Sequence, residues 1–167
     1  NMKINIYTDG SHLDKLNKGR LGCGGIMVEM PDNDEELGKK IGEFSKKVTP
    51  EWLKKTLGTK DVSNPTAELL GVLTALETFN IPDNATVEVI ADYNGVMGFL
   101  GGKWKSREVY IAKVVNKIND TINKKKLKGR ITFGWVKGHQ AKRGMTRDGY
   151  WNSLCDSLAK GLWKDIV

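Results

Sequence analysis

The chain has 167 residues, of which 39% are hydrophobic and 28% charged, and this suits a globular protein that can bury a sizeable core. No stretch approaches the ~20 apolar residues of a membrane span, and the N-terminus lacks the basic-then-apolar pattern of a signal peptide. These features predict one domain over residues 1–167 of a soluble, cytoplasmic protein with no membrane partner. Cys23 and Cys155 have neither metal-binding nor redox spacing, and we expect two reduced core thiols.

The net charge of +7 is distributed unevenly along the chain. Residues 1–102 carry 11 lysines and arginines against 15 acids, a net charge of −4, whereas residues 103–167 carry 16 against 5, a net charge of +11. Such a positive field attracts polyanions, nucleic acid first, although basic proteins also carry charge for solubility alone. Charge by itself leaves both explanations open.

Apolar alternation predicts strands, and 3.6-residue periodicity predicts helices between them. A short helix is expected at 50–58, with Thr49 as its cap and Pro50 at its first position. The full order is strands at 3–8, 22–30 and 37–48, helices at 50–58 and 64–79, a strand at 85–91, a helix with the stripe Ile111, Val115, Ile118 and Ile122, a strand at 130–136 with Ile131, Phe133 and Trp135 on one face, and a helix at 150–163.

This order of elements predicts an α/β fold. The first three strands form an antiparallel meander, and crossover connections make the fourth and fifth strands parallel to the first. We therefore expect a five-stranded mixed sheet flanked by helices, with the last helix starting at the rim where the parallel strands end. Open α/β sheets place their functional sites at this rim.

Five chemically active side chains fall at this rim: Asp9, Glu68, Asp92, His139 and Asp156. Singly, the acids are explained as helix caps or turn residues, and His139 as a surface residue. Four carboxylates together would repel one another strongly without counter-ions, so they predict bound cations, and all-oxygen ligands suit Mg²⁺ or Mn²⁺. Two such ions beside a basic surface indicate phosphodiester hydrolysis.

Five stretches are spread over nearly the whole chain: YTDGS, NPTAELLGVLTALE, VIADYNGV, WVKGHQ and WNSLCDSLAK. In sequence and in order they resemble motifs of the type I ribonuclease H family, whose members have the ribonuclease H-like fold and cut the RNA strand of RNA–DNA hybrids. TDGS alone is a weak signal, but the five together are highly specific. The resemblance implies an endonuclease that uses two Mg²⁺ ions, for which Mn²⁺ can substitute, and leaves 5′-phosphate and 3′-hydroxyl ends.

The resemblance also implies roles for individual residues. The metal-binding carboxylates would be Asp9, Glu68, Asp92 and Asp156. Asp9 would bridge both ions, and His139 would assist proton transfer or product release. Substrate contacts are expected at Gly10, Ser11, Asn17, Ser63, Asn64, Asn94, Lys103, Trp104 and Lys105. A tight turn explains Gly10 equally well, and packing on the core explains Trp104 equally well.

The chain departs from the family pattern around the carboxylates. Tyr93 follows Asp92 where the family usually has serine, Pro65 removes a backbone donor before the buried helix, and residues 49–61 are longer than the usual link. The basic protrusion of many family members is reduced here to GGKWKSR. The expected partner is an RNA–DNA hybrid bound by a monomer, and association with a reverse transcriptase or replication machinery stays open.

Two other classes of protein stay open. Integrases, transposases and junction resolvases use the same fold and also hold two metals with carboxylates, although VKGHQ and the helix of Glu68 favour ribonuclease H. A non-catalytic nucleic-acid-binding module, such as a connection-type domain of a reverse transcriptase, would have lost a carboxylate, and all four are present. A nuclease test on hybrid, duplex DNA and duplex RNA would separate these classes.

Overall fold

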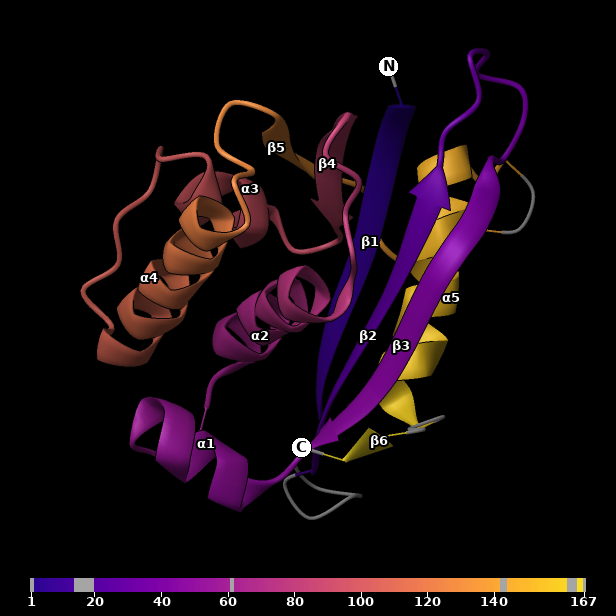
Figure 1. Cartoon of the computed structure of the whole chain (residues 1–167). Coiled ribbons are helices and arrows are strands. Elements are labelled where there is room, and N and C mark those ends of the chain that lie inside the picture. The colour runs from indigo at the N-terminus through magenta and orange to yellow at the C-terminus, as the bar shows by residue number, and fades with distance from the viewer. Residues whose placement is uncertain (1, 14–19, 61, 142–143, 162–164, 167) are drawn as a thin grey trace.

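The computed structural model describes residues 2–13, 20–60, 62–141, 144–161 and 165–166. Their strands form one sheet with the order β5-β4-β1-β2-β3-β6 (Figure 1). The strands are β1 (Met2–Leu13), β2 (Arg20–Glu29), β3 (Lys39–Val48), β4 (Ala85–Ala91), β5 (Ile131–Trp135) and β6 (Asp165–Ile166). The helices are α1 (Pro50–Leu57), α2 (Asn64–Thr78), α3 (Asn94–Leu100), α4 (Val109–Lys124) and α5 (Arg147–Lys160).

The pairing of the strands confirms the predicted mixed sheet. β2 is antiparallel to both β1 and β3, while β4 is parallel to β1 and β5 is parallel to β4. A two-residue strand that the sequence pattern did not indicate, β6, pairs in parallel with Lys46 and Lys47 of β3. The chain thus adds a short sixth strand at the β3 edge of the expected five.

The first strand is longer than predicted. β1 continues through Asp9 to Leu13, and Asp9 pairs with Gly24 in the ladder with β2. The Asp-Gly-Ser triplet is therefore not a turn, because hydrogen bonds to β2 outweigh its local preference. On the opposite side of β1, pairing with β4 stops at Tyr7. Asp9 thus lies on a strand whose neighbour on one side has already ended.

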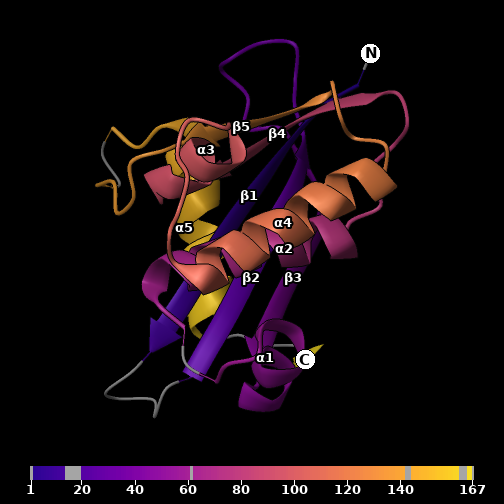
Figure 2. The same cartoon turned by 90° about the vertical axis from the view of Figure 1, so that its left-hand side faces the viewer.

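Helices cover both faces of the sheet. α2 and α4 lie on one face and α5 lies on the other, with α4 stacked outside α2 (Figures 1 and 2). Alternation along β1 sends Ile4 and Ile6 into the main core, under α2 and α4, and Tyr7 into a second cluster, under α5. The described helices include none with both the length and the apolar composition needed to cross a bilayer.

Local signals placed α1 and α4 correctly. The Thr49 side chain accepts a hydrogen bond from the Trp52 amide at 3.2 Å and caps α1, as predicted. In α4 the buried stripe contains Ile111, Ile118 and Ile122, but Val114 is its fourth fully buried member and the predicted Val115 is only partly buried at its edge.

The last helix runs opposite to the predicted direction and begins three residues earlier. Arg147 donates to the carbonyls of Asn33 and Glu36, at the end of the sheet where β1 begins. Further along α5, the Leu158 carbonyl accepts a hydrogen bond from Ser45, close to the end of β3. α5 is therefore parallel to β1, because the connection after β5 returns to the starting end of the sheet before the helix begins. Its third turn, not its first, reaches the rim.

Candidate active site

Three carboxylates from three elements meet where pairing between β1 and β4 stops. Asp9 lies on β1, Glu68 lies in the second turn of α2, and Asp92 follows β4 directly. One oxygen atom from each lies within 4.8 Å of the others. The order of strands and helices therefore produces a compact cluster of acids.

Two glycines allow β1 and α2 to approach closely enough for this meeting. A Cβ atom on Gly10 would overlap the Ala67 carbonyl group, and one on Gly71 would lie 2.9 Å from the Asp9 carbonyl oxygen. Because neither residue has a side chain, the backbone of α2 rests directly on β1. This contact brings Glu68 within reach of Asp9.

The fourth carboxylate faces the same cleft, which has a volume of about 690 Å³. Asp156 of α5 hydrogen-bonds Asp9 and forms a 3.0 Å ion pair with Lys160, one turn further along the helix. His139 also lines the cleft, from an exposed loop position with a left-handed backbone conformation (φ 53°). The structure thus brings all four acids and His139 to one cleft.

Burial and mutual repulsion raise the pKa values of the clustered acids. Desolvation is the main cause of the raised pKa of Asp9, followed by the charges of Glu68 and Asp92. Desolvation also raises the pKa of Glu68, to about 8, against the opposing effect of its hydrogen bond to Asp9. The pKa of Asp92 is raised by burial as well. Without cations, the cluster therefore retains protons near neutral pH.

Three neighbours hold Asp92 in place. The indole nitrogen of Trp135 donates to the Asp92 carbonyl oxygen at 3.1 Å. The Asn152 side chain, which is 3% exposed, hydrogen-bonds the Asp92 carboxylate. Gly138 packs against that carboxylate so closely that a Cβ atom would lie 2.8 Å from Oδ2. The orientation of this acid is therefore fixed by backbone, side-chain and packing contacts together.

The model of the RNase H family matches residues 1–163.

The chain belongs to the RNase H family.

Individual relatives agree with this assignment. Ribonuclease H of Jannaschia sp. (strain CCS1) is 28% identical over 160 residues, covering 92% of this chain and 87% of the relative. The N-terminal RNase H domain of rv2228c from Mycobacterium tuberculosis has a TM-score of 0.65 at 19% identity, covering 95% of this chain and 91% of the other. LC11-RNase H1 in complex with an RNA/DNA hybrid has a TM-score of 0.63 at 20% identity, covering 93% of each chain. The two structures show the RNase H fold and confirm the predicted fold class.

The substrate contacts expected from the RNase H resemblance occupy different surroundings. Those lining the cleft are Gly10, Ser11 and Asn64. Ser63 instead caps α2 by accepting from the Thr66 amide at 3.4 Å, and Asn94 is an exposed residue in the first turn of α3. Asn17 lies outside the described residues.

The shortened basic segment links α3 to α4. Lys103, Trp104 and Lys105 are exposed there and are not part of the cleft lining that the described residues form. The Trp104 ring packs edge-on against Phe99, with ring centroids 5.5 Å apart, yet 44% of the residue remains exposed. It therefore both packs on α3 and presents an aromatic surface to solvent.

Several residues around the RNase H cleft were not predicted as site residues. His12 lies on the extension of β1 that the turn-like triplet concealed. Lys160 follows Asp156 by four residues, a helical spacing that could have indicated the ion pair. Tyr93 lines the cleft, although the sequence indicates it only as a departure from the family pattern. The buried Asn152 belongs to the motif WNSLCDSLAK and precedes Asp156 by four residues, a helical spacing that could have indicated it.

We expect the metal-free protein to lose stability as pH rises from about 4 to about 8. Unfolded carboxyl groups lose their protons near pH 4, whereas Asp9, Glu68 and Asp92 keep theirs to higher pH in the fold. At these three groups the folded state binds more protons than the unfolded state in this window, so their contribution to stability is fullest below pH 4 and declines toward pH 8. Urea unfolding in EDTA at several pH values measures this decline, which should be shallower in Glu68→Gln. If the free energy of unfolding fell equally steeply with pH in wild type and in Glu68→Gln, the expectation would be contradicted.

Proposed function

We propose that the chain acts as one catalytic domain, over residues 1–167, that hydrolyses the RNA strand of RNA–DNA hybrids and leaves 5′-phosphate and 3′-hydroxyl ends. The observation that carries this proposal is the meeting of Asp9, Glu68 and Asp92 within 4.8 Å in a chain of the RNase H family. Similarity to LC11-RNase H1, whose structure contains an RNA/DNA hybrid, supports the substrate class.

The donor set of the cleft fits two Mg²⁺ or Mn²⁺ ions. Its ligands are all carboxylate oxygens, which these hard cations prefer. The Oε2 atom of Glu68 is buried and has no hydrogen-bond partner among the described residues, so a cation would satisfy it. Asp9, Glu68, Asp92 and Asp156 would hold the ions, with Asp9 shared between them. When bound, the two ions supply activation of the attacking water and stabilisation of the departing 3′ oxygen.

The surrounding residues would orient these ligands and move protons. Trp135 and Asn152, which contact the backbone and the carboxylate of Asp92, would hold this acid in position. Lys160 pairs with Asp156 and limits its repulsion with the other acids. His139, on its exposed loop, would assist proton transfer or product departure.

Incubation with a labelled hybrid and Mg²⁺, with an EDTA control, tests the proposal. Duplex DNA and duplex RNA of the same sequence are assayed in parallel. We expect cleavage of the RNA strand of the hybrid alone. Cleavage of duplex DNA would instead favour an integrase-like or resolvase-like nuclease, and hybrid binding without cleavage would favour a non-catalytic module.

Replacement of His139 should slow turnover without removing metal dependence. A group that assists proton transfer contributes typically about 10² to 10⁴ in rate, so His139→Ala should lose at most roughly this factor. Single-turnover cleavage at a series of Mg²⁺ concentrations measures both the rate and the metal requirement. A change in the Mg²⁺ concentration that gives half-maximal rate would assign His139 to metal binding instead.

The segment between α3 and α4 should contribute to hybrid binding through its positive charges. Changing Lys103, Lys105 and Arg107 together to Ala should weaken affinity and flatten the salt dependence of log K, by about 0.9 for each phosphate contact in a B-form duplex. A comparable slope is assumed for a hybrid. Fluorescence anisotropy at several salt concentrations gives both quantities.

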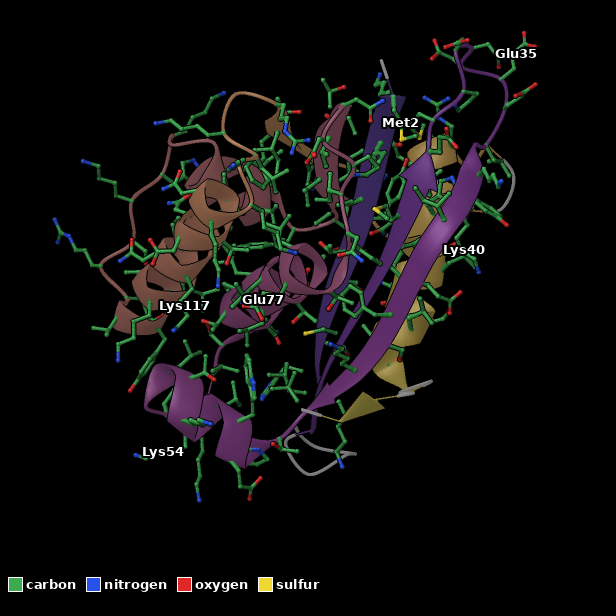
Figure 3. All side chains as sticks on the ribbon, viewed as in Figure 1. Met2, Glu35, Lys40, Lys54, Glu77 and Lys117 are labelled. Atoms are coloured by element: carbon green, nitrogen blue, oxygen red, sulfur yellow. The ribbon has the colours of Figure 1, made fainter. Side chains whose placement is uncertain are left out.

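The outer face of α4 supplies the control for this experiment. Lys117, labelled in Figure 3, and Lys124 are both exposed on this helix. Lys113 is unsuitable because its ammonium donates to the Leu57 carbonyl at 3.0 Å and so supports the end of α1. Stronger effects from Lys117→Ala with Lys124→Ala would make α4 the main nucleic-acid surface.

A further inference from the structure

Tyr93 is an unusual residue for its position at the start of α3. It is the N-cap residue of α3, yet it makes no side-chain capping bond. Asn, Asp and Ser are favoured at this position because their short side chains accept from the first free amides of the helix. Its phenol hydroxyl makes no hydrogen bond to the other described residues. The N-terminus of α3 therefore lacks a side-chain cap and carries an aromatic ring instead.

Gly95 makes room for that ring. A Cβ atom on Gly95 would overlap the Cζ and hydroxyl oxygen atoms of Tyr93, so the ring lies across the first turn of α3. Glycine is one of the least favourable residues inside a helix. Two locally unfavourable choices, an aromatic N-cap and a helical glycine, thus hold one ring in one place. Local rules of this kind are broken mainly where function requires it.

The ring lies in the wall of the proposed catalytic cleft. Tyr93 lines it together with Asn64, Pro65 and Glu68, and its apolar part packs on the main core. Burial and then the charge of Glu68 raise the pKa of the phenol, which places the Tyr93 side chain within the electrostatic field of this acid. Tyr93 therefore presents a fixed aromatic surface and a neutral hydroxyl beside the acidic cluster.

We propose that Tyr93 contacts the RNA strand beside the scissile phosphate, with its ring against a ribose and its hydroxyl hydrogen-bonded to the 2′-hydroxyl of that ribose. This inference rests on the proposed function of the cleft. A 2′-hydroxyl both donates and accepts hydrogen bonds and distinguishes RNA from DNA at a given position. The phenol hydroxyl also does both, and it has no competing partner among the described residues. Tyr93 would thus help this chain to select ribose.

A double-mutant cycle between protein and substrate tests the hydrogen bond. Tyr93→Phe keeps the ring and removes the hydroxyl. The substrates are a short hybrid with one cleavage site and variants with a single 2′-deoxynucleotide on either side of it. We expect Tyr93→Phe to lower kcat/KM on the all-ribose strand roughly 2- to 10-fold, the usual range for one neutral hydrogen bond. One 2′-deoxy substitution should then cost Tyr93→Phe less than wild type by the same factor.

Gly95→Ala tests the placement of the ring independently. The added methyl group must displace the free end of the Tyr93 side chain, while alanine favours the helix. We expect lower kcat/KM and loss of the 2′-deoxy coupling, with unfolding stability equal to or above that of wild type. In a Tyr93→Ser background the same change should have no further effect on kcat/KM, because no ring remains to be displaced.

Tyr150→Phe serves as the matched control, because Tyr150 is an exposed tyrosine on α5 that is not part of the cleft lining. It should leave kcat/KM and the 2′-deoxy effects unchanged. If wild type cleaves hybrids but Tyr93→Phe shows no coupling at either position, the ring is only part of the core and the inference is overturned while the proposed function stands. If wild type cleaves no hybrid, the proposed function fails and this inference falls with it.

Discussion

Asp92→Asn is expected to reduce hybrid cleavage by about 10³-fold or more while making the metal-free protein more stable. Activity falls because an amide replaces a charged ligand, and several kcal/mol of transition-state stabilisation depend on the bound metals. The free energy of unfolding rises because the substitution removes one carboxylate from a cluster in which Asp9, Glu68 and Asp92 repel one another. A gain of about 1 kcal/mol would raise Tm by roughly 2–4 °C in a chain of this size.

Thermal unfolding in EDTA and single-turnover cleavage in Mg²⁺ measure these two effects on the same preparation. Asp120→Asn, at an exposed position on α4, removes the same charge away from the cleft and should change neither. Full activity of Asp92→Asn in Mg²⁺ would rule out its assignment as a metal ligand. A fall in the stability of the metal-free variant would instead show that the contacts to Trp135 and Asn152 outweigh the repulsion.

Gly10→Ala is expected to destabilise the protein by about 3 kcal/mol or more, at the upper end of the range for overpacked sites. The new methyl group would overlap the Ala67 carbonyl group, which belongs to the backbone of α2 and cannot rotate away. Relief requires a shift of α2 away from β1, and this shift separates Glu68 from Asp9. Cleavage should therefore fall together with stability, even though no carboxylate is changed.

Gly161→Ala provides the control for this substitution. Gly161 has a φ of 168°, outside the left-handed region that favours glycine, and among the described residues that are not its chain neighbours no atom lies within 4 Å of the position that a Cβ would take. Its replacement should change the free energy of unfolding by less than about 0.5 kcal/mol. Urea unfolding of both variants measures the difference, and a Gly10→Ala protein as stable as Gly161→Ala would mean that α2 does not depend on this close contact.

Elements with strong local signals were predictable from the sequence. The predicted strand at 85–91 matches the bounds of β4, in which buried and more exposed residues alternate from Ala85 to Val89. Thr49 and Pro50 marked the start of α1, since capping and a fixed φ act within one turn. The order of elements then placed Asp9, Glu68 and Asp92 at one end of the sheet.

Features that depend on distant partners were not predictable. β1 continues through the turn-like triplet at Asp9 because β2 supplies a ladder of hydrogen bonds. The residues of the triplet do not themselves indicate this pairing. The direction of α5 depends on the path of the connection before Arg147. The sequence correctly predicted that Asp156 lies in the cleft, but it did so by assuming that α5 starts at the rim. In the structure the third turn of α5 carries Asp156 to the rim. The contact between Tyr93 and Gly95 was not predictable either, because it depends on the rotamer that the Tyr93 side chain adopts.

The parallel course of α5 and β1 has a consequence for the order in which the protein matures during synthesis. The Tyr7 hydroxyl donates to Asp148 at 2.5 Å, and its carbonyl accepts from the Cys155 thiol, across separations of 141 and 148 residues. β1 thus acquires one of its layers only when α5 has emerged from the ribosome. Asp156 belongs to α5, so a nascent chain that ends before this helix has only three of the four acids and gains the complete site when α5 has been translated.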